Sequence, residues 1–388
     1  MSRFEREMKC MYALVNGRIF TGEKTVFNRA IIIDGKKIKE VVKSEDLDTL
    51  YPEIEKKDID GNLIAPAFID LQLNGCGGVL VNDNLSVETF KIMNETNIKY
   101  GCTMYAPTLI TCEDEKIESA LQVMEEIEDL ESLGVLGLHI EGPYISVDKK
   151  GTHREDLIRI LSDDIIKKIS RSKTTILTLA PENAKPEHIK TLKNGGINVA
   201  LGHTNATYEE VMEKKPYGIT LATHLYNTMS PFTHREPGVI GAVLDSKDIR
   251  AGIIVDGFHC HYASVRIAKK LMGERLYLVT DAASPAGTDM IEFMFEGKKC
   301  FNKDGQLRNE EGNLAGSVLT MDQGVRNLVE YVGVPLEEAL RMASLYPAKA
   351  VNIDDRYGKI ADGYTADLVI IDQKIKLTDV IVKGQSRR

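Results

Sequence analysis

The feature that most constrains the fold is a series of short apolar segments that alternate with helical patterns. Several of the intervening stretches carry apolar residues at helical spacing, and Ser86 and Ser162 are suitable helix N-caps. Eight strand–helix units of this size are typical of a (β/α)8 barrel, although a doubly wound open sheet has the same alternation. We therefore expect an α/β protein built on a (β/α)8 TIM-like barrel. The eight predicted strands are 67–73, 102–109, 135–141, 175–180, 198–203, 219–225, 251–256 and 276–281.

The two ends of the chain contain strand-like segments in place of the strand–helix alternation, and they predict a second, smaller domain. Residues 12–20 and 26–42 read as strands, with a hairpin turn at Asp34-Gly35-Lys36, and residues 366–372 and 379–383 are also strand-like. Because chain termini commonly lie close together, we expect both ends to form one small β-sandwich domain. This domain would comprise residues 11–66 and 358–388, and the barrel would comprise residues 67–357.

The region after the eighth strand predicts an insertion and two closing helices. Residues 293–312 contain an Asp304-Gly305 turn and read as a hairpin. Residues 317–332 and 336–344 carry helical patterns and are expected to complete the barrel.

Composition excludes several classes of protein. The net charge of −9 argues against nonspecific nucleic-acid binding. No apolar run approaches the roughly 18 residues that span a bilayer, and residues 1–10 lack the apolar core of a signal peptide. The six cysteines include no Cys-x-x-Cys pair, which fits a reducing compartment. We expect a cytoplasmic protein with no nucleic-acid or membrane partner.

Four predicted strands end in a carboxylate or an imidazole. Glu141, His203, His224 and Asp281 stand at the ends of the third, fifth, sixth and eighth strands. In a parallel barrel these ends form the rim that carries the chemistry. One carboxylate and two imidazoles are a common ligand set for catalytic zinc, so we interpret Glu141, His203 and His224 as metal ligands. Asp281 is the candidate general base, or alternatively an N-cap for the following turn.

A second group of residues could bind an anion. Asn227 and Thr228 follow the sixth strand closely, and Arg235 comes shortly afterwards. Arginine offers a planar, bidentate clamp for an oxyanion, and backbone amides in turns add uncharged donors. Taken alone, Arg235 would be read as a solvated surface residue, but its position after a rim strand favours binding. His153 follows the third strand and could reach the same cleft, or could be an ordinary loop histidine.

Several short motifs recur in a fixed order along the chain. They are HIEGP at 139–143, LGHT at 201–204, THLYN at 223–227, REPG at 235–238, DGFH at 256–259, TDA at 280–282, LAGS at 314–317 and ASLYPA at 343–348. Each motif is weak evidence by itself. Together they resemble the N-acetylglucosamine-6-phosphate deacetylases, a family within the metal-dependent amidohydrolase superfamily.

This resemblance implies a distorted barrel with a small β-domain from both termini. The reaction would convert N-acetylglucosamine 6-phosphate to glucosamine 6-phosphate and acetate, in amino-sugar catabolism. Glu141, His203 and His224 would bind the divalent metal, and Asp281 would be the catalytic acid/base. His153 would also polarise the acetyl carbonyl. The residues implied in binding the sugar phosphate are Thr152, His153, Asn227, Thr228, Arg235, His259, Leu314, Ala315 and Gly316.

The resemblance also implies a homodimer in which Arg235 and His259 reach the neighbouring active site. Many members of the superfamily have His-x-His at the end of the first strand, where this chain has Gln72-Leu73-Asn74. Amides are poor zinc ligands, so we expect one metal ion per subunit. Zinc is the expected ion, and Fe²⁺ or Mn²⁺ would also fit this ligand set. His139 has no predicted ligand role.

Three other functions fit parts of the pattern. A deacetylase of another amino-sugar phosphate, such as N-acetylgalactosamine 6-phosphate, would share the same metal and phosphate motifs. A ring-opening amidohydrolase of the dihydroorotase or hydantoinase type usually needs the His-x-His pair and often a lysine on the fourth strand, and residues 175–180 contain no lysine. A sugar-phosphate binding protein without activity would not need the complete set of ligands and base.

Overall fold

The structure is a computed structural model that describes residues 11–387. Its contacts group the chain into two compact units. One unit contains the chain up to Ile69, Ile98–Thr103 and the chain from Val334 onward, and the other contains Asp70–Asn97 and Met104–Gly333. Residues 334–357 were expected in the barrel domain but group with the terminal strands. The domain boundaries after residue 66 and before residue 358 remain a prediction.

The eight predicted strand segments form one parallel sheet, in sequence order from first to last. The edge strands meet through backbone hydrogen bonds, in which Asp281 N donates to Gln72 O and Asn74 N donates to Ala282 O, both at 2.9 Å. In a doubly wound sheet the strand order reverses partway across the sheet, whereas these strands keep the order of the sequence throughout. The predicted barrel is therefore confirmed. Its strands are β6 (Phe68–Leu73), β9 (Cys102–Ile110), β10 (Leu138–Glu141), β11 (Thr174–Leu179), β12 (Asn198–Leu201), β13 (Ile219–Ala222), β14 (Arg250–Ile254) and β15 (Leu276–Val279).

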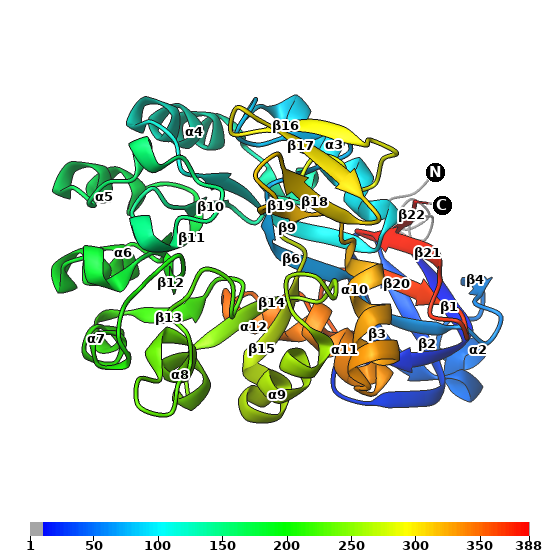
Figure 1. Ribbon diagram of the computed structural model, residues 1–388. Coiled ribbons are helices and arrows are strands. Elements are labelled where there is room, and N and C mark those ends of the chain that lie inside the picture. The colour runs from blue at the N-terminus through cyan, green and yellow to red at the C-terminus, as the bar shows by residue number, and fades with distance from the viewer. Residues whose placement is uncertain (1–10, 388) are drawn as a thin grey trace. The chain divides into compact units, whose positions relative to one another are not determined.

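Helices follow the barrel strands, and Figure 1 shows α4 to α9 in succession around the outside of β10 to β15. The two predicted N-caps are present: Ser86 Oγ accepts from Thr89 N, and Ser162 Oγ accepts from Ile165 N. These side-chain bonds satisfy backbone donors that a helix start leaves without partners. The helices are α3 (Val87–Lys99), α4 (Asp114–Glu126), α5 (Asp163–Ile169), α6 (Pro186–Asn194), α7 (Tyr208–Lys214), α8 (Gly238–Asp245) and α9 (Tyr262–Met272).

The predicted hairpin insertion is a four-stranded antiparallel sheet with the strand order β16-β17-β18-β19. One face of this sheet is an apolar cluster that includes Phe293, Phe295 and Leu307. Ser317 belongs to the last strand, so the predicted helix 317–332 begins later than expected. The strands are β16 (Glu292–Phe295), β17 (Lys298–Lys303), β18 (Gln306–Asn309) and β19 (Leu314–Ser317), followed by α10 (Met321–Asn327) and a π-helical turn (Leu328–Val332).

The remaining unit contains a mixed sheet built from both ends of the chain, as the sequence predicted. Strand β20 pairs antiparallel with β5, which joins the C-terminal strands to the N-terminal ones. Alternate residues of β2 bury their side chains in different apolar clusters, with Ile31 and Ile33 in one and Ala30 and Ile32 in another. The strands are β1 (Met11–Phe20), β2 (Thr25–Asp34), β3 (Lys37–Lys43), β4 (Glu55–Asp58), β5 (Leu63–Pro66), β20 (Leu368–Ile371), β21 (Leu377–Val382) and β22 (Gln385–Ser386).

Three short helices also lie in this unit, α2 (Leu47–Leu50), α11 (Leu336–Ala343) and α12 (Leu345–Ala350). The strand pair β7 (Gly75–Cys76) and β8 (Val79–Leu80) belongs to the barrel unit. Within residues 11–387, no helix has the length and apolar character needed to cross a membrane.

Candidate active site

The predicted ligands and base stand where the barrel strands end. Glu141 is the last residue of β10, and His203, His224 and Asp281 each lie two residues beyond the end of their strand. These last three residues have positive φ angles of 48°, 31° and 50°. Such backbone conformations cost roughly 1–3 kcal/mol each in residues with a Cβ and concentrate at functional sites. The same departure from strand geometry on three strands marks this rim as the functional end of the barrel.

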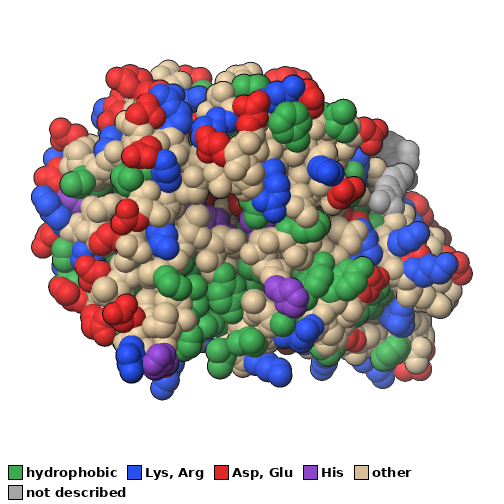
Figure 2. Space-filling model, in the orientation of Figure 1, with side chains coloured by type: hydrophobic (Ala, Val, Ile, Leu, Met, Phe, Trp, Pro, Cys, Tyr) green, Lys and Arg blue, Asp and Glu red, His purple; other side chains and the backbone are tan. Residues whose placement is uncertain are grey.

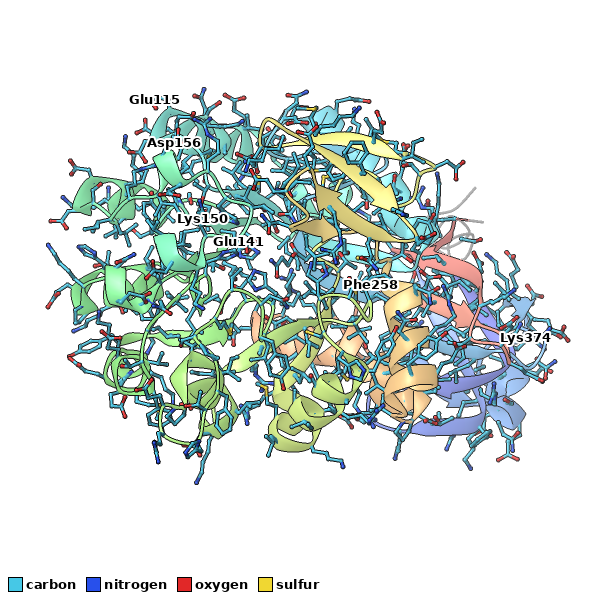
Figure 3. The ribbon with its side chains drawn as sticks, in the orientation of Figure 1. Glu115, Glu141, Lys150, Asp156, Phe258 and Lys374 are labelled. Atoms are coloured by element: carbon cyan, nitrogen blue, oxygen red, sulfur yellow. The ribbon has the colours of Figure 1, made fainter. Side chains whose placement is uncertain are left out.

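Three buried side chains at this rim converge on one point. Glu141 Oε1 lies 3.0 Å from His203 Nε2 and 2.9 Å from His224 Nε2, and the two Nε2 atoms are 3.0 Å apart. A tetrahedral zinc ion with bonds of about 2.0 Å holds its ligands about 3.3 Å apart, so a triangle of this size and composition fits one small divalent cation. Figure 3 shows Glu141 toward the middle of the ring of strands, whereas Glu115 lies at the outside.

The hydrogen bonds around this triangle suit a metal ligand set. His203 Nδ1 bonds to the backbone oxygen of Lys149 at 2.9 Å, which leaves Nε2 unprotonated and available to a cation. Burial alone would raise the pKa of Glu141, but the hydrogen bonds and charges of the two imidazoles hold that pKa well below its usual value. Glu141 is therefore ionised at neutral pH, as a metal ligand must be.

His153 lies beside the triangle, with its ring centre 4.3 Å from that of His203. Its Nδ1 is 2.7 Å from Thr111 Oγ1, so Nε2 remains for another partner. Ligand atoms of Glu141, His153 and His203 all lie within 4.8 Å of one another. Burial and the neighbouring His203 lower the pKa of His153 well below its usual value, which makes it a neutral imidazole at pH 7.

Two amide side chains, Gln72 and Asn74, stand at the end of the first barrel strand, where the motif resemblance led us to look for a His-x-His pair. Gln72 Nε2 donates to Glu141 Oε2 at 3.0 Å and to Asp281 Oδ1 at 3.2 Å, and Asn74 Nδ2 donates to Asp281 Oδ1 at 2.7 Å. The two amides therefore hold both carboxylates with N–H donors. From the sequence alone, these two amides were interpreted only as the absence of metal ligands. Their spacing of two on one strand was the signal, because it predicts side chains on the same face of the strand.

Asp281 is half-buried between these groups. Burial, and then the negative charge of Glu141, raise the pKa of Asp281 to about 6, and the hydrogen bond from Asn74 acts in the opposite direction. A carboxyl group whose pKa lies near neutrality can both accept and release a proton at physiological pH. This environment fits the proton-transfer role that the sequence predicted for Asp281.

The rim residues line a pocket of about 360 Å³. Figure 2 shows histidine side chains at the bottom of a hollow on this face of the molecule. Arg235 is exposed and does not line this pocket, and Ala315 is buried in the apolar cluster of the β16–β19 sheet. The predicted substrate-binding residues that do line the pocket are Thr152, His153, Asn227, Thr228, His259, Leu314 and Gly316.

The position of His259 corrects one prediction. His259 lines the pocket of its own chain, where its Nδ1 bonds to Asp256 Oδ2 at 2.7 Å. It therefore does not extend outward to a neighbouring active site, because the short turn after β14 directs it toward its own rim. The predicted reach of Arg235 into a neighbouring site stays a prediction.

Sequence reasoning also missed several pocket residues from the β16–β19 sheet and the loops. The insertion was predicted as a hairpin, but its register relative to the rim depends on pairing between distant residues. The missed pocket residues are Ile110, Gly151, Phe295, Arg308, Gly312 and Asn313.

The insertion approaches the rim closely at Gly316, which was a predicted residue. Gly316 has a φ of +73°, and a Cβ there would lie 3.1 Å from Asp281 O, so glycine permits this close approach.

His139 is a buried structural residue in the barrel interior. Its Nδ1 lies 3.1 Å from Leu71 O, and its Nε2 lies 2.8 Å from Thr178 Oγ1. Burial lowers the pKa of His139 to about 4, so the ring is neutral. Both ring nitrogens are therefore engaged by neighbouring strands.

Family models match nearly the whole described chain. Residues 63–387 match the amidohydrolase family, and residues 11–64 match the NagA composite domain. The chain belongs to the amidohydrolase family. This membership agrees with the cluster of buried glutamate and histidine side chains that could hold a metal ion.

Two curated relatives of this amidohydrolase are named as deacetylases of different amino-sugar phosphates. It is 44% identical to the N-acetylglucosamine-6-phosphate deacetylase of Haemophilus influenzae, over 96% of this chain and 98% of the relative. It is 38% identical to the N-acetylgalactosamine-6-phosphate deacetylase of a Shewanella species, over 84% of this chain and 83% of the relative.

Solved structures give the same picture. The structure of N-acetylglucosamine-6-phosphate deacetylase from Pasteurella multocida aligns with a TM-score of 0.93 at 42% identity, covering 97% of this chain and 99% of the other. A mutant of the Mycobacterium smegmatis enzyme in complex with N-acetyl-D-glucosamine-6-phosphate aligns with a TM-score of 0.89 at 26% identity, covering 97% of this chain and 99% of the other. The resemblance inferred from the motifs is thereby confirmed.

The triangle predicts the metal content of the amidohydrolase. We expect the purified wild-type protein to hold about one divalent ion per chain, and His203→Ala and His224→Ala each to lose most of it, because two remaining ligands bind too weakly. Elemental analysis after gel filtration measures this ratio. His188→Ala is the matched control, since His188 is also buried but pairs with Asp163 on α5. Full metal retention in both ligand variants would contradict the assignment.

Proposed function

We propose that this amidohydrolase hydrolyses the acetamide of N-acetylglucosamine 6-phosphate to give glucosamine 6-phosphate and acetate. The observation that carries the proposal is the convergence of Glu141, His203, His224 and Asp281 on one pocket of a size that admits a sugar phosphate. The extended similarity to the Haemophilus influenzae deacetylase supports the same reaction. The product amine would feed amino-sugar catabolism.

Glu141, His203 and His224 are the residues that would hold the metal ion, one per chain. A divalent cation there supplies Lewis-acid polarisation of a carbonyl and activation of water. Zinc is the expected ion, and Fe²⁺ or Mn²⁺ would fit the same nitrogen and oxygen ligands. The amides of Gln72 and Asn74 fill the neighbouring position with hydrogen-bond donors, which supports a single ion.

Asp281 would move the proton during hydrolysis. Its Oδ1 already accepts hydrogen bonds from Gln72 and Asn74, so Oδ2 is the oxygen left for chemistry. Asp281 Oδ2 would take a proton from the attacking water and then deliver it to the departing amine nitrogen. This single carboxyl group would thus act first as the base and then as the acid.

His153 would orient and polarise the acetyl group. When its Nδ1 accepts from the Thr111 hydroxyl, Nε2 carries the ring proton and can donate it to the acetyl carbonyl oxygen. A neutral histidine serves this purpose, which agrees with the lowered pKa of His153.

The remaining pocket residues would hold the sugar phosphate. Hydroxyl, amide and imidazole groups of Thr152, Asn227, Thr228 and His259 face the same cavity, together with the β19 backbone at Leu314 and Gly316. Arg235 would add a bidentate phosphate contact from the partner subunit of a homodimer, since it is exposed and lies outside its own pocket. Its neighbour Phe232 is 61% exposed, which fits a contact surface for a second copy.

The substrate is tested by acetate release from two phosphorylated epimers. We expect hydrolysis of N-acetylglucosamine 6-phosphate, with kcat/KM about tenfold or more above that for N-acetylgalactosamine 6-phosphate, because one misplaced hydroxyl leaves buried hydrogen-bonding groups unpaired. The second candidate function is deacetylation of the galactose epimer, which the Shewanella relative favours. A reversed preference would establish it, and no acetate from either sugar would indicate a binding protein without activity.

Replacement of the proton-transfer group gives a second prediction. Asp281→Asn keeps the shape and an acceptor for Asn74 but cannot take a proton, so we expect kcat to fall by about 10²- to 10⁴-fold while the metal content stays near wild type. Acetate release and elemental analysis on the same preparation measure both quantities. Turnover near the wild-type rate would refute the role of Asp281.

The phosphate role of Arg235 gives a third prediction. Arg235→Ala should raise KM for the phosphorylated sugar by about 10- to 100-fold, the effect of losing a charge-assisted bidentate contact, and should change unphosphorylated N-acetylglucosamine much less. Arg171→Ala, at another exposed arginine outside the pocket, is the matched control. Equal losses for both sugars would exclude a phosphate contact.

A further inference from the structure

The pocket carries few positive charges to balance an anionic substrate. Glu141 and Asp281 both contribute carboxyl groups to the cavity, and a sugar phosphate brings close to two further negative charges at pH 7. A divalent ion held by Glu141, His203 and His224 would offset the charge of Glu141, which leaves Asp281 and the phosphate without a counter-charge. Among the described residues that line this pocket, Arg308 is the one lysine or arginine.

Arg308 is presented to the pocket by the register of the β16–β19 sheet. Leu307 and Asn309 are buried, whereas Arg308 between them is exposed, as the alternation of a strand requires. Arg308 pairs across the sheet with Leu314, which lines the same pocket from β19 (Figure 1). Arg308 therefore lines the cavity from β18 and remains accessible to solvent.

The charge of Arg308 is held in place but not neutralised. Its Nη1 donates to Gly312 O, and its Nε donates to Gln306 Oε1 at 3.0 Å. Both acceptors are neutral, and no carboxylate within residues 11–387 forms an ion pair with Arg308. Two lysines of the same sheet differ in this respect, because Lys298 pairs with Glu311 and Lys299 pairs with Glu292, each at 2.8 Å.

We propose that Arg308 binds the phosphate group of the substrate within its own chain and thereby selects phosphorylated sugars. The two neutral hydrogen bonds pre-orient the guanidinium, and the N–H groups of Nη2 have no protein acceptor among the described residues, so they are available to phosphate oxygens. This inference rests on the proposed deacetylase function. It adds a phosphate contact that requires no partner subunit, unlike that of Arg235.

Steady-state kinetics of Arg308→Gln test the proposal. We expect kcat/KM for N-acetylglucosamine 6-phosphate to fall by about 10- to 100-fold, mostly through KM, and that for unphosphorylated N-acetylglucosamine to change less than about twofold. Arg308→Lys should recover part of the loss, because it keeps the charge without the bidentate geometry. Lys303→Gln, an exposed cation of β17 that does not line the pocket, is the matched control.

Inhibition by inorganic phosphate gives a second readout that does not depend on the sugar. With unphosphorylated N-acetylglucosamine as substrate, we expect the phosphate inhibition constant to rise about tenfold or more in Arg308→Gln, and to become less sensitive to salt. Unchanged KM and phosphate inhibition in a well-folded Arg308→Gln enzyme would overturn the inference alone. Failure of the wild-type enzyme to release acetate from the phosphorylated sugar would overturn the proposed function, and the inference with it.

Discussion

The contact between one buried carboxylate and two imidazoles governs the rest of this structure. A lone ionised glutamate in the interior of a barrel would be strongly destabilised by the loss of water. Glu141 instead shares one oxygen with His203 and His224 and receives a hydrogen bond from Gln72 on the other. Glu141 ends β10, and its partners come from β6 and the segments after β12 and β13, so distant parts of the chain must reach this rim together for the carboxylate to be tolerated.

The pair of amides on the first barrel strand orients the carboxyl groups of the rim. Gln72 and Asn74 place N–H donors against Glu141 and Asp281, which holds the two nearby carboxyl groups in fixed orientations. Asp70 continues the same arrangement below the rim, since its carboxyl group accepts from the backbone of Gln72 and from Thr280 beside Asp281. The first and last strands of the barrel are thus joined by side-chain bonds as well as by backbone bonds.

The barrel could be predicted from the sequence because its signals are local. Each strand is a short aliphatic run, and Glu141, His203, His224 and Asp281 are adjacent to those runs, so the rule that parallel strand ends meet at one rim was enough to assemble the candidate ligands. The sequence did not predict that His259 and Arg308 would both line the pocket of their own chain. Their positions depend instead on pairing between segments far apart in sequence. Ser317 shows the same limit, because its helical surroundings in sequence were outweighed by backbone bonds to Asp281 and Ala283.

Those bonds at Ser317 have a mechanical consequence. Ser317 N donates to Asp281 O at 2.9 Å, and Ala283 N donates to Ser317 O at 3.0 Å, so β19 is joined directly to the segment that carries Asp281. The β16–β19 sheet is therefore unable to move independently of this segment, and any displacement of β19 also displaces Asp281. Because two backbone hydrogen bonds couple the pocket strand β19 to Asp281, a substitution that shifts one of them shifts the other.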